Sequence, residues 1–191
     1  MSRAAIFIDG AYFDCVLRDE FNSVKVNYAE FSRVIAGNID LLRTYYYHCL
    51  PYQSNPPTPE ERERFSKAQK FFEALERLPR FEVRQGKLEF RGIDQSGKPI
   101  FEQKRVDLLM GIDLVRLATK QQITHAFLIT GDSDLLPAIE IAKSEGVLIH
   151  LWHGRVHRPH SDLWRIADER TEFTQEFINR VRMAEQENRL T

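Results

Sequence analysis

The sequence contains few features that hold a chain together by anything other than a packed core. Its 191 residues include two cysteines, Cys15 and Cys49, which lie far apart and outside any Cys-x-x-Cys motif. This spacing argues against a disulfide framework or a zinc ribbon and favours a reducing, cytoplasmic setting. No apolar run approaches the roughly 20 residues that a membrane-spanning helix needs. The first strand-like run also meets Asp9 too early for a signal peptide, so we expect a cytoplasmic protein with no membrane partner.

An excess of charge of one sign is also missing. Lys and Arg number 27 and Asp and Glu number 28, which excludes a globally basic nucleic-acid coat but not a local basic patch. With 42% apolar and 29% charged residues, the composition is that of a globular chain and not of a disordered one. We expect one domain over residues 1–191, which is large enough to fold without disulfides or a structural metal.

What the sequence does contain is a regular alternation of short apolar runs and amphipathic segments. Strands are expected at residues 4–8, 41–50, 126–130 and 147–152, and helices at 12–18, 28–36, 60–78, 104–120 and 135–144. This alternation predicts a three-layer, Rossmann-like α/β fold with a parallel sheet and helices on both faces. Three further segments interrupt or close this pattern: a proline-rich loop at 51–59, a small antiparallel, ribbon-like elaboration at 81–103 and closing helices at 162–185.

Acidic side chains follow two of the predicted strands and open one of the helices. Asp9 ends the first strand, Asp132 and Asp134 follow the third, and Asp107 lies in the first turn of the helix at 104–120. Because ligands bind outside the carboxyl ends of parallel strands, we expect these acids to share one rim. Two carboxylates about 4 Å apart repel by roughly 4 kcal/mol at an effective dielectric of 20, so they either take up protons or bind a cation. Oxygen ligands select Mg²⁺ or Mn²⁺, which indicates phosphodiester hydrolysis.

Each acid taken alone also has a structural explanation. An Asp-Gly pair after a strand is a common turn, Asp132 and Asp134 are typical of a helix N-cap, and Asp107 complements a helix dipole. Asp113 differs because it falls on the apolar face of its helix and therefore needs a partner there. It is either a support for the metal site or a structural acid bonded to the backbone. The shared rim is what favours a functional role for the others.

Basic residues gather in two segments. The segment 152–160 follows a predicted strand and offers Arg and His side chains for phosphate contacts beside an aromatic residue. A second basic run lies on the ribbon, and Lys104 stands one turn before Asp107. The candidate nucleic-acid contacts are Lys104, Arg155, Arg158, His157, Arg84 and Lys87. A solvated surface is the simpler explanation for each segment, and a zinc triad of His153, His157 and His160 is a rarer alternative.

Three motifs, in this order, resemble those of the NYN family, in its LabA-like (DUF88) branch of the PIN-like nucleases. They are IFIDG at 6–10, KRVD at 104–107 with Asp113 on the same helix, and LITGDSD at 128–134. The resemblance covers nearly the whole chain and implies a PIN-like fold, a site of clustered aspartates for Mg²⁺ or Mn²⁺, and single-stranded or structured RNA as substrate. By matching position, it gives the metal and catalytic roles to Asp9, Asp107, Asp132 and Asp134, and it extends the metal set to Asp113.

One departure from the family pattern keeps two functions open. Relatives often carry Asn shortly after the first Asp-Gly, where this chain has Ala11-Tyr12. The first interpretation is a metal-dependent endoribonuclease, and the second is a catalytically weak NYN module that binds RNA or a protein partner. A more remote alternative is a phosphatase, because Asp132-Ser133-Asp134 resembles the Asp-x-Asp of haloacid dehalogenases, which usually follows the first strand. The sequence does not decide between a monomer and a homo-oligomer.

Overall fold

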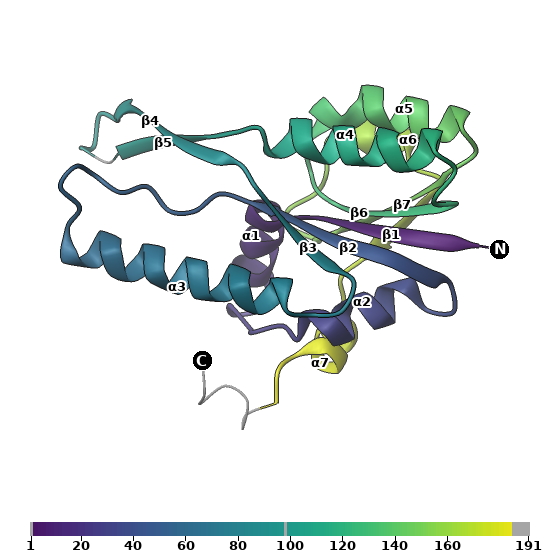
Figure 1. Cartoon of the computed structure of the whole chain (residues 1–191), viewed down its shortest axis with the longest axis horizontal. Helices are drawn as coiled ribbons and strands as arrows, with labels where there is room; N and C mark the ends of the chain where they lie inside the picture. Colours follow the sequence, from purple (N-terminus) through teal and green to yellow (C-terminus); the bar gives the residue numbers. More distant parts are fainter. Residues whose placement is uncertain (1, 98, 185–191) are drawn as a thin grey trace.

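The main feature of the fold is a six-stranded, all-parallel sheet (Figure 1). The computed structural model describes residues 2–97 and 99–184. The strands of the sheet, in spatial order, are β3 (Phe81–Gln85), β2 (Asp40–His48), β1 (Arg3–Asp9), β6 (His125–Ile129), β7 (Leu148–His153) and β8 (Glu169–Glu172). A separate antiparallel ribbon pairs β4 (Lys87–Ile93) with β5 (Pro99–Lys104). The predicted parallel α/β sheet with an antiparallel elaboration is therefore confirmed.

Helices cover both faces of this sheet, which gives the predicted three layers (Figure 1). One face carries α4 (Val106–Thr119), α5 (Leu136–Ser144) and α6 (Ser161–Ile166), and the other carries α1 (Gly10–Glu20), α2 (Tyr28–Ala36), α3 (Pro59–Glu76) and α7 (Gln175–Val181). A short 3-10 turn, Ser133–Leu135, leads into α5. No described helix is long and apolar enough to cross a membrane.

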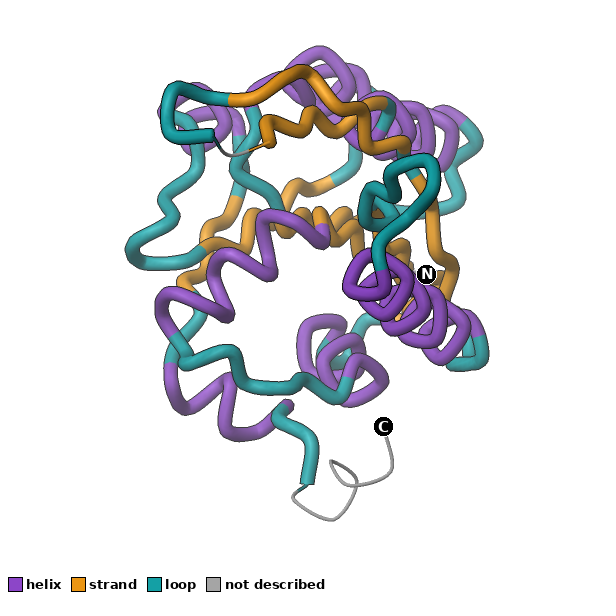
Figure 2. Tube along the Cα trace, turned by 90° about the vertical axis from the view of Figure 1, so that its left-hand side faces the viewer, coloured by secondary structure: helices purple, strands orange, loops and turns teal. Residues whose placement is uncertain are grey.

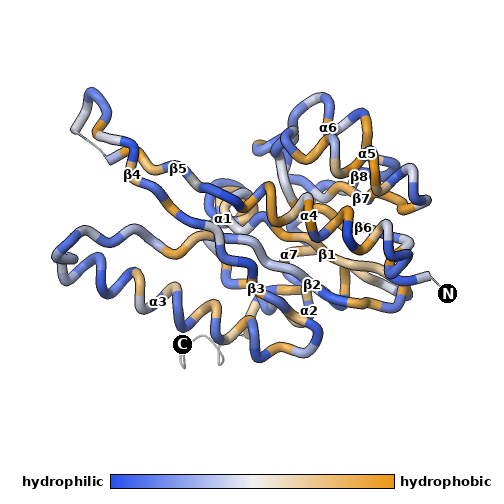
Figure 3. Tube along the Cα trace, turned by 45° about the horizontal axis from the view of Figure 1, so that its top comes forward, coloured by the Kyte–Doolittle hydropathy of each residue, from blue (hydrophilic) through white to orange (hydrophobic). Residues whose placement is uncertain are grey.

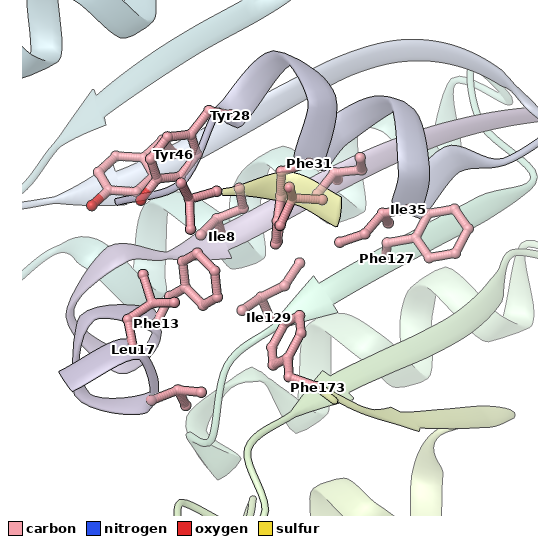
Figure 4. Close-up of a cluster of buried hydrophobic side chains, with 14 of the residues drawn as sticks. Ile8, Phe13, Leu17, Tyr28, Phe31, Ile35, Tyr46, Phe127, Ile129 and Phe173 are labelled. Carbon is pink, nitrogen blue, oxygen red and sulfur yellow. The ribbon is translucent and has the colours of Figure 1, made fainter. Parts of the chain in front are cut away.

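Alternate strand residues supply two separate cores, one under each helical layer. In β1, Ile6 and Ile8 pack on the side of α1 and α2, whereas Phe7 packs on the side of α4. Figure 4 shows the first of these clusters, in which rings from α1, α2 and the segment after β8 meet the sheet. The tyrosine run of β2 is divided in the same way, and all three rings are buried, as expected for sheet core. Burying each large apolar side chain contributes roughly 1.5–3 kcal/mol.

The order of the strands locates the part of the sheet where a ligand is expected. The chain first builds outward from β1 to β3, then returns to the other side of β1 and builds outward again from β6 to β8. Sheets of this order bind ligands at the carboxyl ends of the two strands where the direction reverses, here β1 and β6. The register pairs Ile8 with Ile129, so the loop after β6 leaves the sheet directly beside Asp9.

Two segments differ from the sequence prediction. Residues 81–85 belong to the main sheet, because they pair in parallel with Thr44–His48 and bury Val83, so the ribbon itself is formed by β4 and β5. The closing segment contains the strand β8 between α6 and α7, and all four β8 side chains are exposed. Its sequence Glu-Arg-Thr-Glu therefore carries no apolar alternation that would reveal a strand. Residues 98 and 185, which lie within the predicted ribbon and closing helices, are outside the described residues.

The ribbon and α3 both extend beyond the carboxyl edge of the sheet (Figure 1). Figure 2 views the molecule from this edge, with the ribbon at the top and α3 below it on the right. α3 follows the predicted proline-rich loop and begins with a capping box between Thr58 and Glu61. Hydrophobic and hydrophilic residues alternate along it (Figure 3), but only Phe72 and Leu75 are buried.

Candidate functional site

Asp9 ends β1 and at the same time caps α1. Its Oδ1 accepts a hydrogen bond of 3.1 Å from the backbone N–H of Tyr12. The pKa of this carboxyl group is raised to about 6, chiefly by burial and in part by the negative charge of Asp107, while the hydrogen bond from the Tyr12 N–H acts in the opposite direction. At neutral pH, Asp9 therefore carries a charge that its surroundings disfavour.

The other three predicted acids lie on the same rim. Asp132 caps the 3-10 turn after β6, where its Oδ1 accepts the N–H of Asp134 at 2.9 Å. Asp107 lies in the first turn of α4 and is partly buried. Burial raises its pKa, and the charges of Asp132 and Asp134 raise it further. All four acids thus lie on one rim, and Asp107 is within electrostatic range of each of the other three.

Within the described residues, the charge of these four acids is left without Lys or Arg partners, and the imidazole of His48 lowers the pKa of Asp9. Among the described residues, none of the four carboxylates forms an ion pair with Lys or Arg. Nor does any group of three or more His, Cys, Asp or Glu side chains within 2–97 and 99–184 lie close enough together to hold a metal ion. Mg²⁺ commonly keeps several waters and takes only one or two carboxylates together with substrate phosphates. The oxygen donors therefore fit an open site of that kind and do not fit a closed cage of protein ligands.

The structure places Asp113 in a separate network. Its buried carboxylate accepts hydrogen bonds from the Tyr47 hydroxyl at 3.1 Å and from Arg84 Nε at 3.0 Å, and it pairs with Arg116 at 2.8 Å. Asp113 is also six residues beyond Asp107, which is about 9 Å farther along the helix axis. The partner predicted for it exists, but it consists of side chains and not of the backbone. We therefore leave Asp113 out of the rim site.

The candidate contacts on and around the ribbon are paired with acids. Arg84 contacts Asp113 and Glu82 and lies over the Tyr45 ring. Lys87 pairs with Glu89 at 3.4 Å, and Lys104 pairs with Glu102 at 2.7 Å. The side chains expected to form a second basic run are thus balanced by their neighbours, which leaves little free positive charge for phosphate there.

The loop at 154–160 does share the rim with the acids. It leaves β7 beside β6, and the N–H of His160 donates to the carbonyl of Gly131 at 3.1 Å. Arg155 and Arg158 are exposed, and the described part of the chain offers neither an acid as ion-pair partner. His157 differs, because its Nε2 lies 2.7 Å from Asp19 Oδ2. The zinc-triad alternative finds no support, since the described His residues form no metal-binding group.

Three further residues make contacts near the rim that the sequence did not predict. The Tyr12 ring lies against Gly131, where an added Cβ would come within 2.8 Å of the ring. Glu20 accepts backbone N–H groups from the loop at 154–160. Arg105 precedes α4 with a left-handed backbone, φ 75°, which residues other than glycine rarely adopt, and no ion pair to it is found within the described chain. The sequence shows these residues but not which loop each one meets.

Comparisons with known proteins agree with this architecture. A solved protein of unknown function, VPA0982 from Vibrio parahaemolyticus RIMD 2210633, has a TM-score of 0.58, 18% identity and coverage of 93% of this chain and 96% of that one, which shows a shared fold. "Uncharacterized protein y4oD" of Sinorhizobium fredii (strain NBRC 101917 / NGR234) is 40% identical over 50 residues, which span 26% of this chain and 23% of that protein. The NYN domain matches residues 3–172. The chain therefore belongs to the NYN domain family, within the PIN-like nuclease superfamily.

Proposed function

We propose that this protein is a metal-dependent endoribonuclease of the LabA-like branch. The observation that carries the proposal is the set of four carboxylates at the reversal point between β1 and β6, without a compensating Lys or Arg among the described residues. Acids in this state need either protons or a cation. NYN nucleases generally use divalent metals, which makes a cation the better explanation.

We propose that Asp107 contacts the metal directly and that Asp9 and Asp132 act on it through bound waters, because no three described carboxylates lie close enough to hold the ion together. When bound, Mg²⁺ or Mn²⁺ supplies positive charge for the phosphate and acidifies a bound water. The backbone N–H groups of Tyr12 and Ala11 hold the Asp9 carboxylate in place, Tyr12 through Oδ1. Asp134 is exposed at the mouth of the site, where its carboxylate orients the attacking water and receives its proton.

The substrate phosphates would meet positive charge on two sides of these acids. Arg155 and Arg158 come from the loop after β7, and Arg105 stands immediately before α4. Each is exposed and free of an ion pair among the residues described. The start of α4, which has no side-chain cap, also lies on the rim, and helix N-termini favour anions. These groups contact the RNA backbone and do not distinguish its bases.

A second candidate function is an RNA-binding module without catalysis. The observation that favours it is Tyr12, which stands where relatives often carry Asn and which has both its ring and its hydroxyl engaged by neighbouring loops. No polar group at this position is left to orient water. The phosphatase alternative has no comparable support, because Asp132 and Asp134 follow β6 and not β1.

The decisive experiment is a cleavage assay on single-stranded and structured RNA with Mg²⁺, with Mn²⁺ and with EDTA. We expect wild-type protein to cut RNA only with the divalent ion, and Asp132→Asn to remove the activity without loss of fold. RNA binding without cleavage in any metal would replace the nuclease by the binding module. Phosphate release from a small phosphomonoester, with RNA left intact, would favour the phosphatase.

A further inference from the structure

The loop that carries Arg155 and Arg158 is attached to the far end of α1 by a single carboxylate. Glu20 accepts three successive backbone N–H groups, from Arg155 at 2.7 Å and from Val156 and His157 at 3.1 Å each. Successive N–H groups that converge in this way form an anion-binding concavity, often called a nest. Here the anion is supplied by the protein, so these backbone groups are not available for a phosphate.

Two more side chains of α1 hold the same loop. The Tyr12 hydroxyl donates to the carbonyl of His157 at 2.6 Å and accepts the N–H of Gly154 at 3.2 Å. Asp19 Oδ2 lies 2.7 Å from His157 Nε2. We call Tyr12, Asp19 and Glu20 the α1 anchor. His157 meets all three members, through its carbonyl, its ring and its N–H respectively.

The α1 anchor also connects this loop to the acids. The backbone N–H of Tyr12 is the donor that holds Asp9, and its ring lies against Gly131, one residue before Asp132. One residue in the first turn of α1 therefore contacts the segments that carry two of the four acids and the segment that carries the arginines. Gly154 is required at the start of the loop, because a Cβ there would collide with Glu20 and with Val16.

We propose that the α1 anchor positions Arg155 and Arg158 for the phosphates of a bound RNA strand; this inference rests on the function proposed above. The nest fixes the backbone of the loop, and both arginine side chains remain exposed and form no ion pair within the described residues. A loop that is already ordered loses less conformational entropy on binding than a free one. Through its hydroxyl, Tyr12 thereby contributes to holding the substrate by way of this loop.

A double-mutant cycle on RNA affinity distinguishes a purely structural role of the α1 anchor from a role in positioning the arginines. If Glu20 only stabilises the fold, the effects of Glu20→Ala and of Arg155→Ala/Arg158→Ala on RNA affinity add together. If Glu20 acts through the arginines, removing them costs little once Glu20 is absent. Glu30→Ala on α2 is the matched control, because Glu30 is a paired surface glutamate on another helix.

The test measures RNA affinity in EDTA, where no cleavage occurs, and backbone amide exchange at residues 154–158. Glu20→Ala should speed exchange in this loop, lower affinity about as much as the double arginine variant does, and lower the slope of log affinity against log salt by about 0.7 for each lost phosphate contact on single-stranded RNA. Tyr12→Phe removes only the hydroxyl and should change exchange, affinity and salt slope in the same direction. This variant provides the test if Glu20→Ala does not fold. Glu30→Ala should change none of these quantities.

The outcomes separate this inference from the proposed function. Unchanged exchange at 154–158, or additive losses of affinity, together with normal RNA binding by the wild type, would overturn the role of the α1 anchor alone. Failure of the wild type to bind any RNA would overturn the proposed function and this inference with it. Faster exchange with a non-additive loss of affinity would support both.

Discussion

Two aspartates on the same helix have opposite surroundings. Asp113 is buried, and Tyr47, Arg84 and Arg116 all contact its carboxylate. Asp107, nearer the start of α4, has no such partner among the described residues, and burial together with the charges of Asp132 and Asp134 raises its pKa. Within the described residues, Asp113 is therefore paired with two arginines, whereas Asp107 has no such pairing.

The surroundings of an acid therefore indicate, better than its residue type does, whether it serves the fold or the function. A buried charge that serves the fold is paired, because an unpaired one is costly. A cluster of acids that repel one another lowers stability, and this cost points to a ligand that supplies the missing charge. The same contrast holds for the basic side chains, since Lys87 and Lys104 on the ribbon are paired and Arg155 and Arg158 on the rim are not, within the described residues.

The largest expected effect is on the rate of RNA cleavage, which should distinguish Asp107 from Asp113. Asp107→Asn should lower the rate of RNA cleavage by about 100-fold or more, because it removes charge that acts on the reacting phosphate or its metal. Asp113→Asn should leave the rate per folded molecule nearly unchanged. The assay is initial cleavage rate with Mn²⁺, corrected for the folded fraction by circular dichroism. Equal losses in both variants would remove the distinction between the two acids.

The converse experiment measures stability in the absence of metal. Asp113→Asn should lower the free energy of unfolding by about 2–3 kcal/mol, because it leaves Arg84 and Arg116 without their shared carboxylate. Asp107→Asn should leave stability unchanged or raise it, since it relieves repulsion. Urea unfolding in EDTA gives both values. A strongly destabilised Asp107→Asn protein would show that this acid is needed by the fold.

A smaller effect is expected in the pH dependence of metal-free stability, through Asp9. Its pKa is about 6 in the folded protein and 3.8 in the absence of these surroundings, so the folded state binds the proton more tightly. Stability should therefore fall as pH rises from about 4 to about 6 and lose no more to this group above that range. The loss is about 2–3 kcal/mol, at about 1.4 kcal/mol for each pKa unit.

Asp9→Asn provides the control for this profile. Asn keeps an oxygen that accepts the Tyr12 N–H but does not titrate, so the decline between pH 4 and 6 should be reduced relative to the wild type. Thermal unfolding of both proteins in EDTA across pH 4–8 measures the difference. Parallel profiles for the two proteins would show that Asp9 is solvated normally.

The sequence was sufficient to locate the acids because each follows a segment with a strong local signal. Apolar runs predict β1 and β6, so the topology rule puts Asp9 and Asp132 on one rim, and the first turn of α4 adds Asp107. The partners of Asp113 were not predictable in this way. They come from β2, β3 and α4, and only the parallel pairing of β3 with β2 brings Arg84 to the helix.

The α1 anchor could not be predicted from the sequence either, because it also depends on contacts between distant segments. Glu20 and Asp19 look like surface acids at the end of a helix, and nothing local indicates that a loop more than a hundred residues later folds onto them. Tyr12 was visible only as a departure from a family pattern. Long-range hydrogen bonds to backbone groups leave no periodic signal in the sequence, so they are found only in the folded structure.

The smallest expected effect compares the free and the paired cations in RNA binding. Replacing Arg155 and Arg158 with Ala should weaken binding to every RNA sequence alike and lower the salt slope by about 1.4, at about 0.7 for each phosphate contact on single strands. Lys87→Ala should change the slope little, because Glu89 already compensates that charge. Fluorescence anisotropy with a labelled oligonucleotide in EDTA, over a range of salt concentrations, measures both. A larger slope change in Lys87→Ala would move the RNA path from the rim loop to the ribbon.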